Sequence, residues 1–199
     1  MATEQPARPL LQREAIVDTA RDLIRAHGLH RLSLRRLAGQ LGVTAPALYA
    51  HVADKGDLLR AVAELEFGRL VARFDAVTTD DPLGRLRAYH RAYVDHARED
   101  PELFEVMFVF PPDVGATELP EGAELPAATR TFTIALAAVE NAIAAEAIRS
   151  DDPLLVSLTL WTAAHGVASA LRLGLGLPPD LEDRLVEESL DRLLAGWSG

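Results

Sequence analysis

The chain has 199 residues, is 49% hydrophobic, carries a net charge of −10 and contains no cysteine. The length fits one or two domains, and the lack of cysteine excludes disulfides and thiolate metal sites. The N-terminus "MATEQPARPL" has no apolar run, so no signal peptide is predicted and a cytoplasmic protein is expected.

The charge is distributed unevenly along the chain. Residues 1–60 hold nine basic and six acidic side chains, whereas the remaining residues hold 11 basic and 24 acidic ones. A mildly basic head on a strongly acidic body suggests two separate tasks, of which the first can involve nucleic acid. Chance clustering of solvated charges is the alternative.

Apolar residues recur with helical spacing almost everywhere, which predicts an all-α fold of about nine helices. Asp-Pro pairs at residues 81–82, 100–101 and 152–153 indicate helix starts, because aspartate caps a helix and proline suits its first position. The predicted helices cover residues 9–27, 34–40, 45–51, 55–77, 82–99, 101–109, 127–149, 153–173 and 181–196. The Pro- and Gly-rich segment 111–126 is predicted to be a loop.

Two short helices, 34–40 and 45–51, form a predicted helix-turn-helix. Ser33 and Thr44 are the expected caps, and Gly42 supplies the tight turn because glycine adopts positive φ without strain. Leu48 and Val52 are spaced to face inward, so the other side of the second helix faces outward. An ordinary corner of a helical protein is the alternative interpretation.

The outward side of residues 45–51 is small at its start and polar at its end. Small residues let a helix approach a DNA groove closely. Tyr49 and His51 can donate hydrogen bonds to phosphate oxygens, and Lys55 adds a positive charge. Taken singly, Tyr49 is also compatible with a packing role and His51 with a surface role.

The segment "RLSLRRLAGQLGVTAPALYAHVADKGDLL" resembles the DNA-binding domain of the TetR family of transcriptional regulators, over about residues 10–60. The resemblance implies a three-helix DNA-binding domain in residues 1–60, a linking helix at 55–77, and an effector-binding and dimerisation domain in 78–199. It implies base or groove contacts by Arg35, Thr44, Ala45, Pro46 and Ala47. It implies phosphate contacts by Ser33, Tyr49, His51 and Lys55.

The recognition helix departs from that of the tetracycline repressor branch of this family. Ala45, Ala47 and Ala50 replace glutamine, threonine and tryptophan, and alanine cannot hydrogen-bond to a base edge. We therefore expect a different operator, in which Arg35 or Arg36 reads guanine.

In the acidic body, "LWTAAHGVASALRLG" (160–174) resembles a tryptophan–histidine–glycine motif of one class of TetR-type C-terminal domains. Small residues recur there every four positions and allow close helix contact, and an apolar stripe follows in the last helix. These features predict a homodimer interface made by Gly166, Ala170, Gly174, Val186, Leu190, Leu193 and Trp197. Packing of both stripes inside one subunit is the alternative.

Aromatic, methionine and histidine side chains in the body suggest a cavity for a small apolar or aromatic effector. The expected lining residues are Leu86, His90, Tyr93, Phe104, Met107, Phe108, Phe132, Trp161 and His165. Each of them is also compatible with an ordinary place in the core, and a structural role is a specific alternative for His165.

The sequence contains no HExxH, GxSxG or Gly-rich phosphate motif, so an enzyme is not expected, nor is a cofactor or metal. His96 and Asp100 could share a metal by spacing, but Asp100 is expected to cap a helix. The uncharged stretch 153–171 is expected to be a buried helix rather than a membrane span. The sequence thus predicts a DNA-binding, effector-responsive homodimer, with repression expected from the family resemblance. An interaction protein with an unused head is the alternative.

Overall fold

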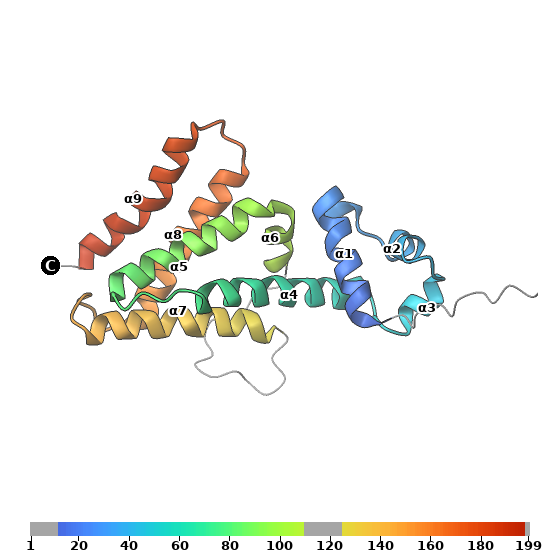
Figure 1. The fold of residues 1–199 in the computed structure, drawn as a ribbon, viewed down its shortest axis with the longest axis horizontal. Helices are drawn as coiled ribbons and strands as arrows, with labels where there is room; N and C mark the ends of the chain where they lie inside the picture. Colours follow the sequence, from blue (N-terminus) through green and yellow to red (C-terminus); the bar gives the residue numbers. More distant parts are fainter. Residues whose placement is uncertain (1–11, 110–124, 198–199) are drawn as a thin grey trace, which may run out of the picture.

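The computed structural model describes residues 12–109 and 125–197, and every regular element in them is a helix. The predicted all-α fold is confirmed (Figure 1). The elements are α1 (Arg13–His27), the 3₁₀ turn η1 (Leu29–Arg31), α2 (Leu34–Gln40), α3 (Ala45–Tyr49), α4 (Lys55–Asp75), α5 (Pro82–Glu99), α6 (Pro101–Met107), α7 (Pro126–Ala144), α8 (Pro153–Arg172) and α9 (Pro179–Trp197).

Figure 1 shows α1, α2 and α3 grouped at one end of an elongated molecule, with α5 to α9 forming the body at the other end. The helix α4 starts beside α3 and runs along the body next to α7. We call residues 12–54 the head and residues 76–197 the body. The single long helix α4 therefore joins the two.

The main error in the predicted helix boundaries concerns α7, which ends at Ala144 rather than at residue 149. The chain turns at Glu146, which has a φ of 58°, and the N–H groups of Ala147 and Ile148 both bond back to the Ala142 carbonyl. This closure buries Ile148. The turn η1 was not predicted, and both the start of the first predicted helix at 9–11 and loop residues 111–124 lie outside the described residues.

Most of the predicted caps are present. The side chains of Ser33, Asp54, Asp81 and Asp152 each accept a hydrogen bond from a backbone N–H of the first helical turn. Thr44 occupies the cap position of α3 without such a bond. Asp100 likewise occupies the predicted cap position of α6, but its carboxylate accepts two hydrogen bonds from Arg25, at 2.6 Å each, instead of one from the helix backbone.

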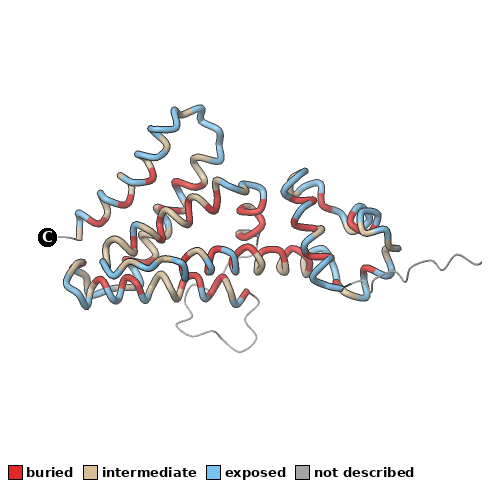
Figure 2. Tube along the Cα trace, in the orientation of Figure 1, coloured by how far each residue is buried: buried red, intermediate tan, exposed pale blue. Residues whose placement is uncertain are grey.

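A continuous hydrophobic core follows α4 from the head into the body (Figure 2). At the head end Leu58 is fully buried, with Leu48 of α3 also at 0% exposure. At the body end Phe67, Leu70 and Phe74 are buried. Truncating a fully buried leucine costs about 2–5 kcal/mol, so this core ties the position of α3 to the body.

The helix α8 is long and apolar enough to cross a membrane by length and composition, and it is the one such helix in the described ranges. In this fold it packs against α5, α7 and α9, as a helix of a soluble protein can. Only 28% of its apolar window is buried, however. Part of an apolar helix therefore faces outward from the single chain.

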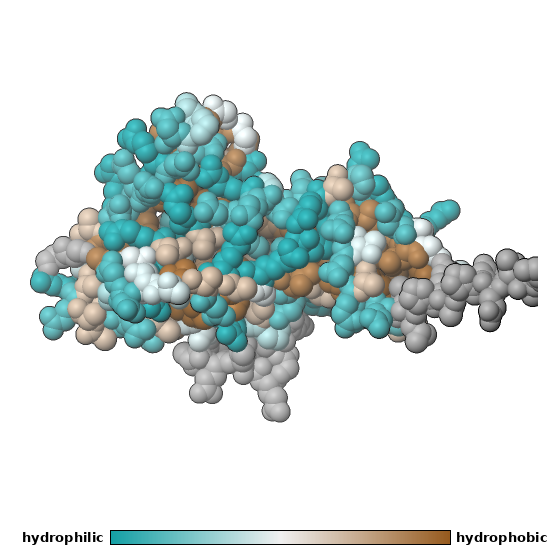
Figure 3. All heavy atoms as spheres, in the orientation of Figure 1, coloured by the Kyte–Doolittle hydropathy of each residue, from teal (hydrophilic) through white to brown (hydrophobic). Residues whose placement is uncertain are grey.

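A row of ion pairs holds α9 to α5. Arg87 pairs with Asp191 at 2.8 Å, and Arg91 pairs with Glu187 at 2.6 Å. Figure 3 shows mostly hydrophilic atoms over these two helices in this view. This side of α9 is therefore a charged, solvated surface.

Candidate DNA-binding face and effector cavity

The helix-turn-helix has the predicted geometry. Gly42 has a φ of 65°, and the Val43 N–H bonds to the Ala38 carbonyl at 2.9 Å, which closes the turn between α2 and α3. Leu48 and Val52 are 0% and 2% exposed and anchor the inner side of α3. Tyr49, the residue after Leu48, lies outside this inner side and is 54% exposed.

The structure brings the predicted DNA-contact residues to one end of the head. The exposed members of the set are Ser33, Arg35, Arg36, Thr44, Pro46, Ala47, Tyr49 and Lys55, and the partly buried members are Ala45 and His51. The Ser33 oxygen accepts the Arg36 N–H at 3.2 Å, so it caps α2 while its own O–H remains free to donate. These side chains thus form a polar and basic surface around the exposed side of α3.

Arginines of the head fall into two groups. On the scaffold side, Arg13 pairs with Asp57 at 2.6 Å and Arg25 pairs with Asp100 at the same distance. On the side of the head that carries α2 and α3, Arg35 and Arg36 have no side-chain hydrogen bond or ion pair within the described part of the chain. Their charges are therefore available to phosphates or base edges.

One positioning contact was not predicted from the sequence. The Arg13 guanidinium donates to the His51 carbonyl at 2.6 Å and pairs with Asp57, which also accepts the Ala53 N–H at 2.9 Å. The hydrogen bond from Arg13 is the main reason that the pKa of Asp57 lies below its ordinary value. This clamp ties α1 to the segment between α3 and α4, which connects Tyr49 to Lys55.

A second group of charges lies where the head meets the body. Arg21 of α1 and Glu66 of α4 form a buried ion pair, at 5% and 1% exposure. His96 of α5 lies 3.9 Å from the Glu66 carboxylate, and burial lowers the pKa of His96 to about 4. A neutral histidine therefore packs against this pair at pH 7.

The body contains a largely apolar cavity of about 80 Å³ between α4, α5, α7 and α8. Its walls are Phe67, Phe74, Leu86, Tyr89, His90, Tyr93, Phe108, Ala128, Thr131, Phe132, Ala135, Val139, Ser157, Leu160, Trp161, Ala164 and Leu190. Six predicted residues are among them: Leu86, His90, Tyr93, Phe108, Phe132 and Trp161.

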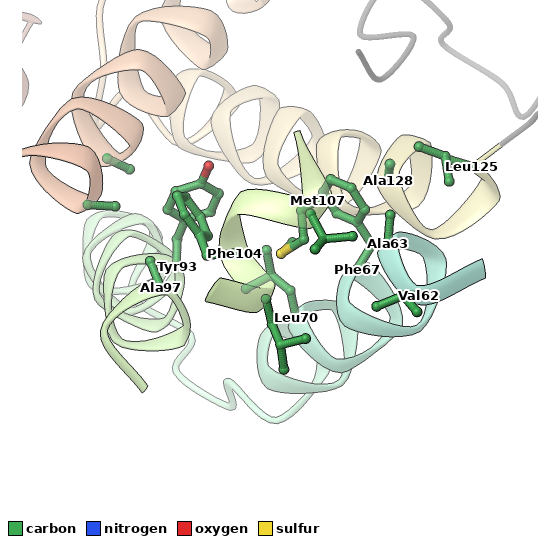
Figure 4. Packing of buried hydrophobic residues seen from close by; sticks show 14 of the residues in the cluster. Val62, Ala63, Phe67, Leu70, Tyr93, Ala97, Phe104, Met107, Leu125 and Ala128 are labelled. Atoms are coloured by element: carbon green, nitrogen blue, oxygen red, sulfur yellow. The ribbon is translucent and has the colours of Figure 1, made fainter. Parts of the chain in front are cut away.

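The other three predicted pocket residues do not line this cavity. Phe104 and Met107 are buried in the core, and Figure 4 shows Phe104 beside Tyr93, with ring centroids 5.7 Å apart. His165 does not line the cavity itself but contacts a residue that does, since its Nδ1 lies 2.9 Å from the Tyr93 hydroxyl.

The lining residues contributed by α4 and α7 were missed, apart from Phe132. Phe67 and Phe74 of α4 and Thr131 of α7 belong to this group. Their spacing indicates only that each faces inward, and the enclosure of a cavity depends on how four helices meet.

Burial sets the protonation of the polar groups near the cavity. It lowers the pKa values of His90 and His165, and it raises the pKa of Tyr93. The histidines are therefore neutral and the phenol is protonated at pH 7.

The predicted interface set needs correction. Val186 and Leu190 are 1% and 2% exposed within the single chain, so they leave no surface to bury against a second copy. Gly174 lies beyond the end of α8, with a φ of 63°, and is not part of a helical ridge.

The remaining four members of that set keep some exposed surface. Gly166 of α8 is exposed, and Ala170, Leu193 and Trp197 are partly buried. Trp197 also packs against the core of its own chain.

Across the described residues, no group of three or more histidine, aspartate or glutamate side chains could hold a metal ion. The spacing of His96 and Asp100 allowed such a site. In the structure Asp100 is bonded to Arg25 instead, and His96 faces Glu66.

Two family models match the chain. Residues 16–62 match "Bacterial regulatory proteins, tetR family", and residues 86–194, more than half of the chain, match "Tetracyclin repressor-like, C-terminal domain". An uncharacterized HTH-type transcriptional regulator of Mycobacterium tuberculosis is 27% identical over 98% of this chain and 86% of its own length. The class C tetracycline repressor of Escherichia coli is 52% identical over 54 residues, which are 27% of this chain and 25% of that protein.

Solved structures share the fold. A protein of unknown function from Rhodococcus sp. RHA1 has a TM-score of 0.80 and 28% identity, over 98% of this chain and all of that one. A TetR variant from Acinetobacter baumannii, in complex with minocycline, has a TM-score of 0.69 and 20% identity, over 94% and 96%. From its matched models, its helix-turn-helix and its helical body, the chain belongs to the TetR family and is a DNA-binding transcriptional regulator, not an enzyme.

Proposed function

We propose that this regulator is a homodimeric repressor. It binds a near-palindromic operator with its two heads, and it leaves the operator when a small apolar or aromatic molecule occupies the cavity of the body. The N-terminal region through α3 contacts DNA, α4 links the two regions, and the rest of the chain binds the effector and the second subunit. A soluble, cytoplasmic protein fits this function.

The observation that carries the proposal is the course of α4. This helix begins at Lys55, beside the exposed surface of α3, and brings Phe67 and Phe74 into the wall of the cavity. Its 21 residues span roughly 30 Å at 1.5 Å per residue. A molecule that displaces either phenylalanine therefore moves the helix that positions the head.

DNA binding follows from the surface of the head. The small side chains of Pro46 and Ala47 allow α3 to lie deep in a major groove, and Tyr49 and Lys55 can reach the phosphates at its edge. Arg35 or Arg36 is proposed to read guanine, since the alanines of α3 cannot hydrogen-bond to bases.

Dimerisation is supported by apolar surface that the single chain leaves exposed on and after α8. Leu155 is 60% exposed and Leu173 is 74% exposed, and both lie on the same side of α8 as Gly166. A Cβ added to Gly166 would meet no atom within 4 Å, so packing within the chain does not require glycine there. Close approach of a second copy would explain this surface.

Effector binding is supported by the cavity and by relatives. The Acinetobacter baumannii structure contains minocycline, and a structure of RolR, with a TM-score of 0.66, contains resorcinol. In the proposed tryptophan–histidine–glycine motif of this chain, Trp161 lies in the cavity wall and His165 lies beside Tyr93. The ring centroids of Trp161 and His165 are 5.5 Å apart. The motif is proposed to shape the effector site.

The DNA flanking the gene supplies the test. Fluorescence anisotropy would measure binding of the full-length protein to labelled inverted repeats from that DNA, with shuffled repeats as controls. The proposal expects sequence-specific binding that weakens steeply as salt rises. Absence of specific binding to every repeat would contradict it and would favour an interaction protein with an unused head.

A further inference from the structure

The polar groups around the cavity differ in how well they are satisfied. The Tyr93 hydroxyl lies within hydrogen-bond distance of His165 Nδ1, at 2.9 Å, and interacts with the Trp161 side chain. The Thr131 hydroxyl donates to the Ala127 carbonyl at 2.8 Å. These groups have their main hydrogen bonds without any ligand.

His90 differs from Tyr93 and Thr131 in this respect. It lines the cavity and is 6% exposed, and its Nδ1 has no hydrogen-bond partner in the part of the chain that the structure describes. Its other ring nitrogen, Nε2, lies 3.3 Å from the Ser189 hydroxyl. A buried ring nitrogen without a partner is unfavourable by itself, so it indicates a site that something else completes.

The surroundings of Nε2 determine what Nδ1 needs. The Ser189 hydroxyl donates to the Val186 carbonyl at 3.0 Å, so its hydrogen is used and its oxygen can accept from His90. On this basis we assign the proton of the neutral ring to Nε2. Nδ1 is then a lone-pair acceptor, and only a donor can complete it.

The rest of the wall defines the other properties of the ligand. None of the side chains that line the cavity is an aspartate, glutamate, lysine or arginine, so a charged ligand would lose its hydration without gaining a counter-charge. Seven aromatic side chains contribute to the wall: Phe67, Phe74, Tyr89, Tyr93, Phe108, Phe132 and Trp161. They offer ring faces and edges to a planar apolar molecule.

We propose that the cavity binds an uncharged aromatic molecule that donates one hydrogen bond, from a hydroxyl or N–H group, to Nδ1 of His90. This inference rests on the proposed function, because it names the chemistry of the effector for the same site. Water can supply the donor when the ligand is absent. A ligand must then replace that water's hydrogen bond, which an ether or hydrocarbon of the same shape does not do.

The test uses three matched probes on the wild-type, full-length protein: 4-ethylphenol, 4-ethylanisole and 4-ethylbenzoate. Isothermal titration calorimetry in the absence of DNA would give each dissociation constant. We expect the phenol to bind at least about tenfold more tightly than the ether, and the benzoate to bind more weakly still. Equal affinity for phenol and ether, or no phenol binding at millimolar concentration, would overturn the inference.

Variants assign the preference to one atom. His90→Phe should bind the phenol and the ether equally, and His90→Asn should restore part of the preference because its amide oxygen can accept near the same position. Ser157→Ala, which removes another hydroxyl of the wall, is the matched control and should keep the preference. A preference that survives in a folded His90→Phe protein would overturn the inference.

A spectroscopic measurement does not depend on any variant. In ¹⁵N NMR spectra of the wild-type protein, His90 should show a protonated Nε2 and an unprotonated Nδ1, and the phenol should shift the Nδ1 resonance. A protonated Nδ1 would overturn the inference. Release of operator DNA by the phenol is measured separately, so selective binding without release would contradict the proposed function and leave the ligand chemistry intact.

Discussion

On the side of the head that is proposed to face DNA, Arg35 and Arg36 are exposed and have no ion pair among the described residues. On α5 of the body, Arg87 and Arg91 each pair with a carboxylate of α9. The same residue type thus has two uses. Paired arginines help hold helices together, whereas unpaired ones add little to folding and keep their charge for another molecule.

The buried ion pair at the junction between head and body is the strongest example of an arginine that holds helices together. Breaking this pair is expected to have the largest effect of the variants considered. Glu66→Leu would leave Arg21 buried without its carboxylate, which should reduce the free energy of unfolding by about 3–5 kcal/mol. Urea unfolding followed by circular dichroism would measure this loss.

The double variant Arg21→Met with Glu66→Leu should recover most of the stability, because no unpaired charge remains. The exposed pair of Arg130 and Asp75 is the control, and Asp75→Ala should cost less than about 1 kcal/mol. If Glu66→Leu cost no more than the control, the buried pair would not contribute to holding the head.

The same junction should make stability depend on pH. The pKa of His96 falls from its ordinary 6.5 to about 4 because burial disfavours the charged ring. The unfolded chain therefore binds a proton first, so stability is full above pH 6.5 and falls by on the order of 2–3 kcal/mol as the pH drops toward 4.

Unfolding curves between pH 7.5 and 4 would measure this slope. His96→Asn should flatten it, although His90 and His165 will still contribute because burial lowers their pKa values too. The exposed residue His30 gives the matched variant, His30→Asn, whose slope should equal that of the wild type. An unchanged slope in His96→Asn would argue against His96 as the source of this pH dependence.

The outer surface of α8 is a second surface left for another molecule, because Gly166 is proposed to meet a second copy of the chain there. Gly166→Leu should weaken dimerisation by more than about tenfold in sedimentation, because the larger side chain separates the two helices. Gly68→Leu on α4 is the control, since neither glycine has an atom within 4 Å of an added Cβ. Normal dimers in Gly166→Leu would remove α8 from the interface.

The smallest effect is expected on the head surface. Tyr49→Ala should weaken operator binding about tenfold for all operator sequences and should leave stability and dimerisation unchanged. Tyr49→Phe removes only the hydroxyl, so its operator affinity should lie between that of the wild type and that of Tyr49→Ala. Anisotropy titrations measure both, and an unaltered affinity in Tyr49→Ala would refute the proposed phosphate contact.

The head could be predicted from sequence because its structure depends on neighbouring residues. Ser33 caps α2, Gly42 makes the turn, and Leu48 and Val52 define the inner side of α3, all within 20 residues. Its long-range clamp could not be predicted in this way, since Arg13 and Asp57 are 44 positions apart and no local pattern links them.

The body was predicted less completely for the same reason. The stripe containing Val186 and Leu190 indicated an apolar contact, but periodicity does not distinguish the chain's own core from a second subunit. Both residues proved to be buried within the chain. Phe67 and Phe74 were missed in the cavity because its walls come from helices that are distant in sequence.

Photocrosslinking tests the central claim that the exposed side of α3 contacts DNA. A benzophenone amino acid would replace Ala47 on α3 or, as the control, Ala137 on α7, which is also an exposed alanine of a helix. The account predicts crosslinks to operator DNA from position 47 and none from position 137. No crosslink from position 47 in a protein that still binds its operator would contradict it.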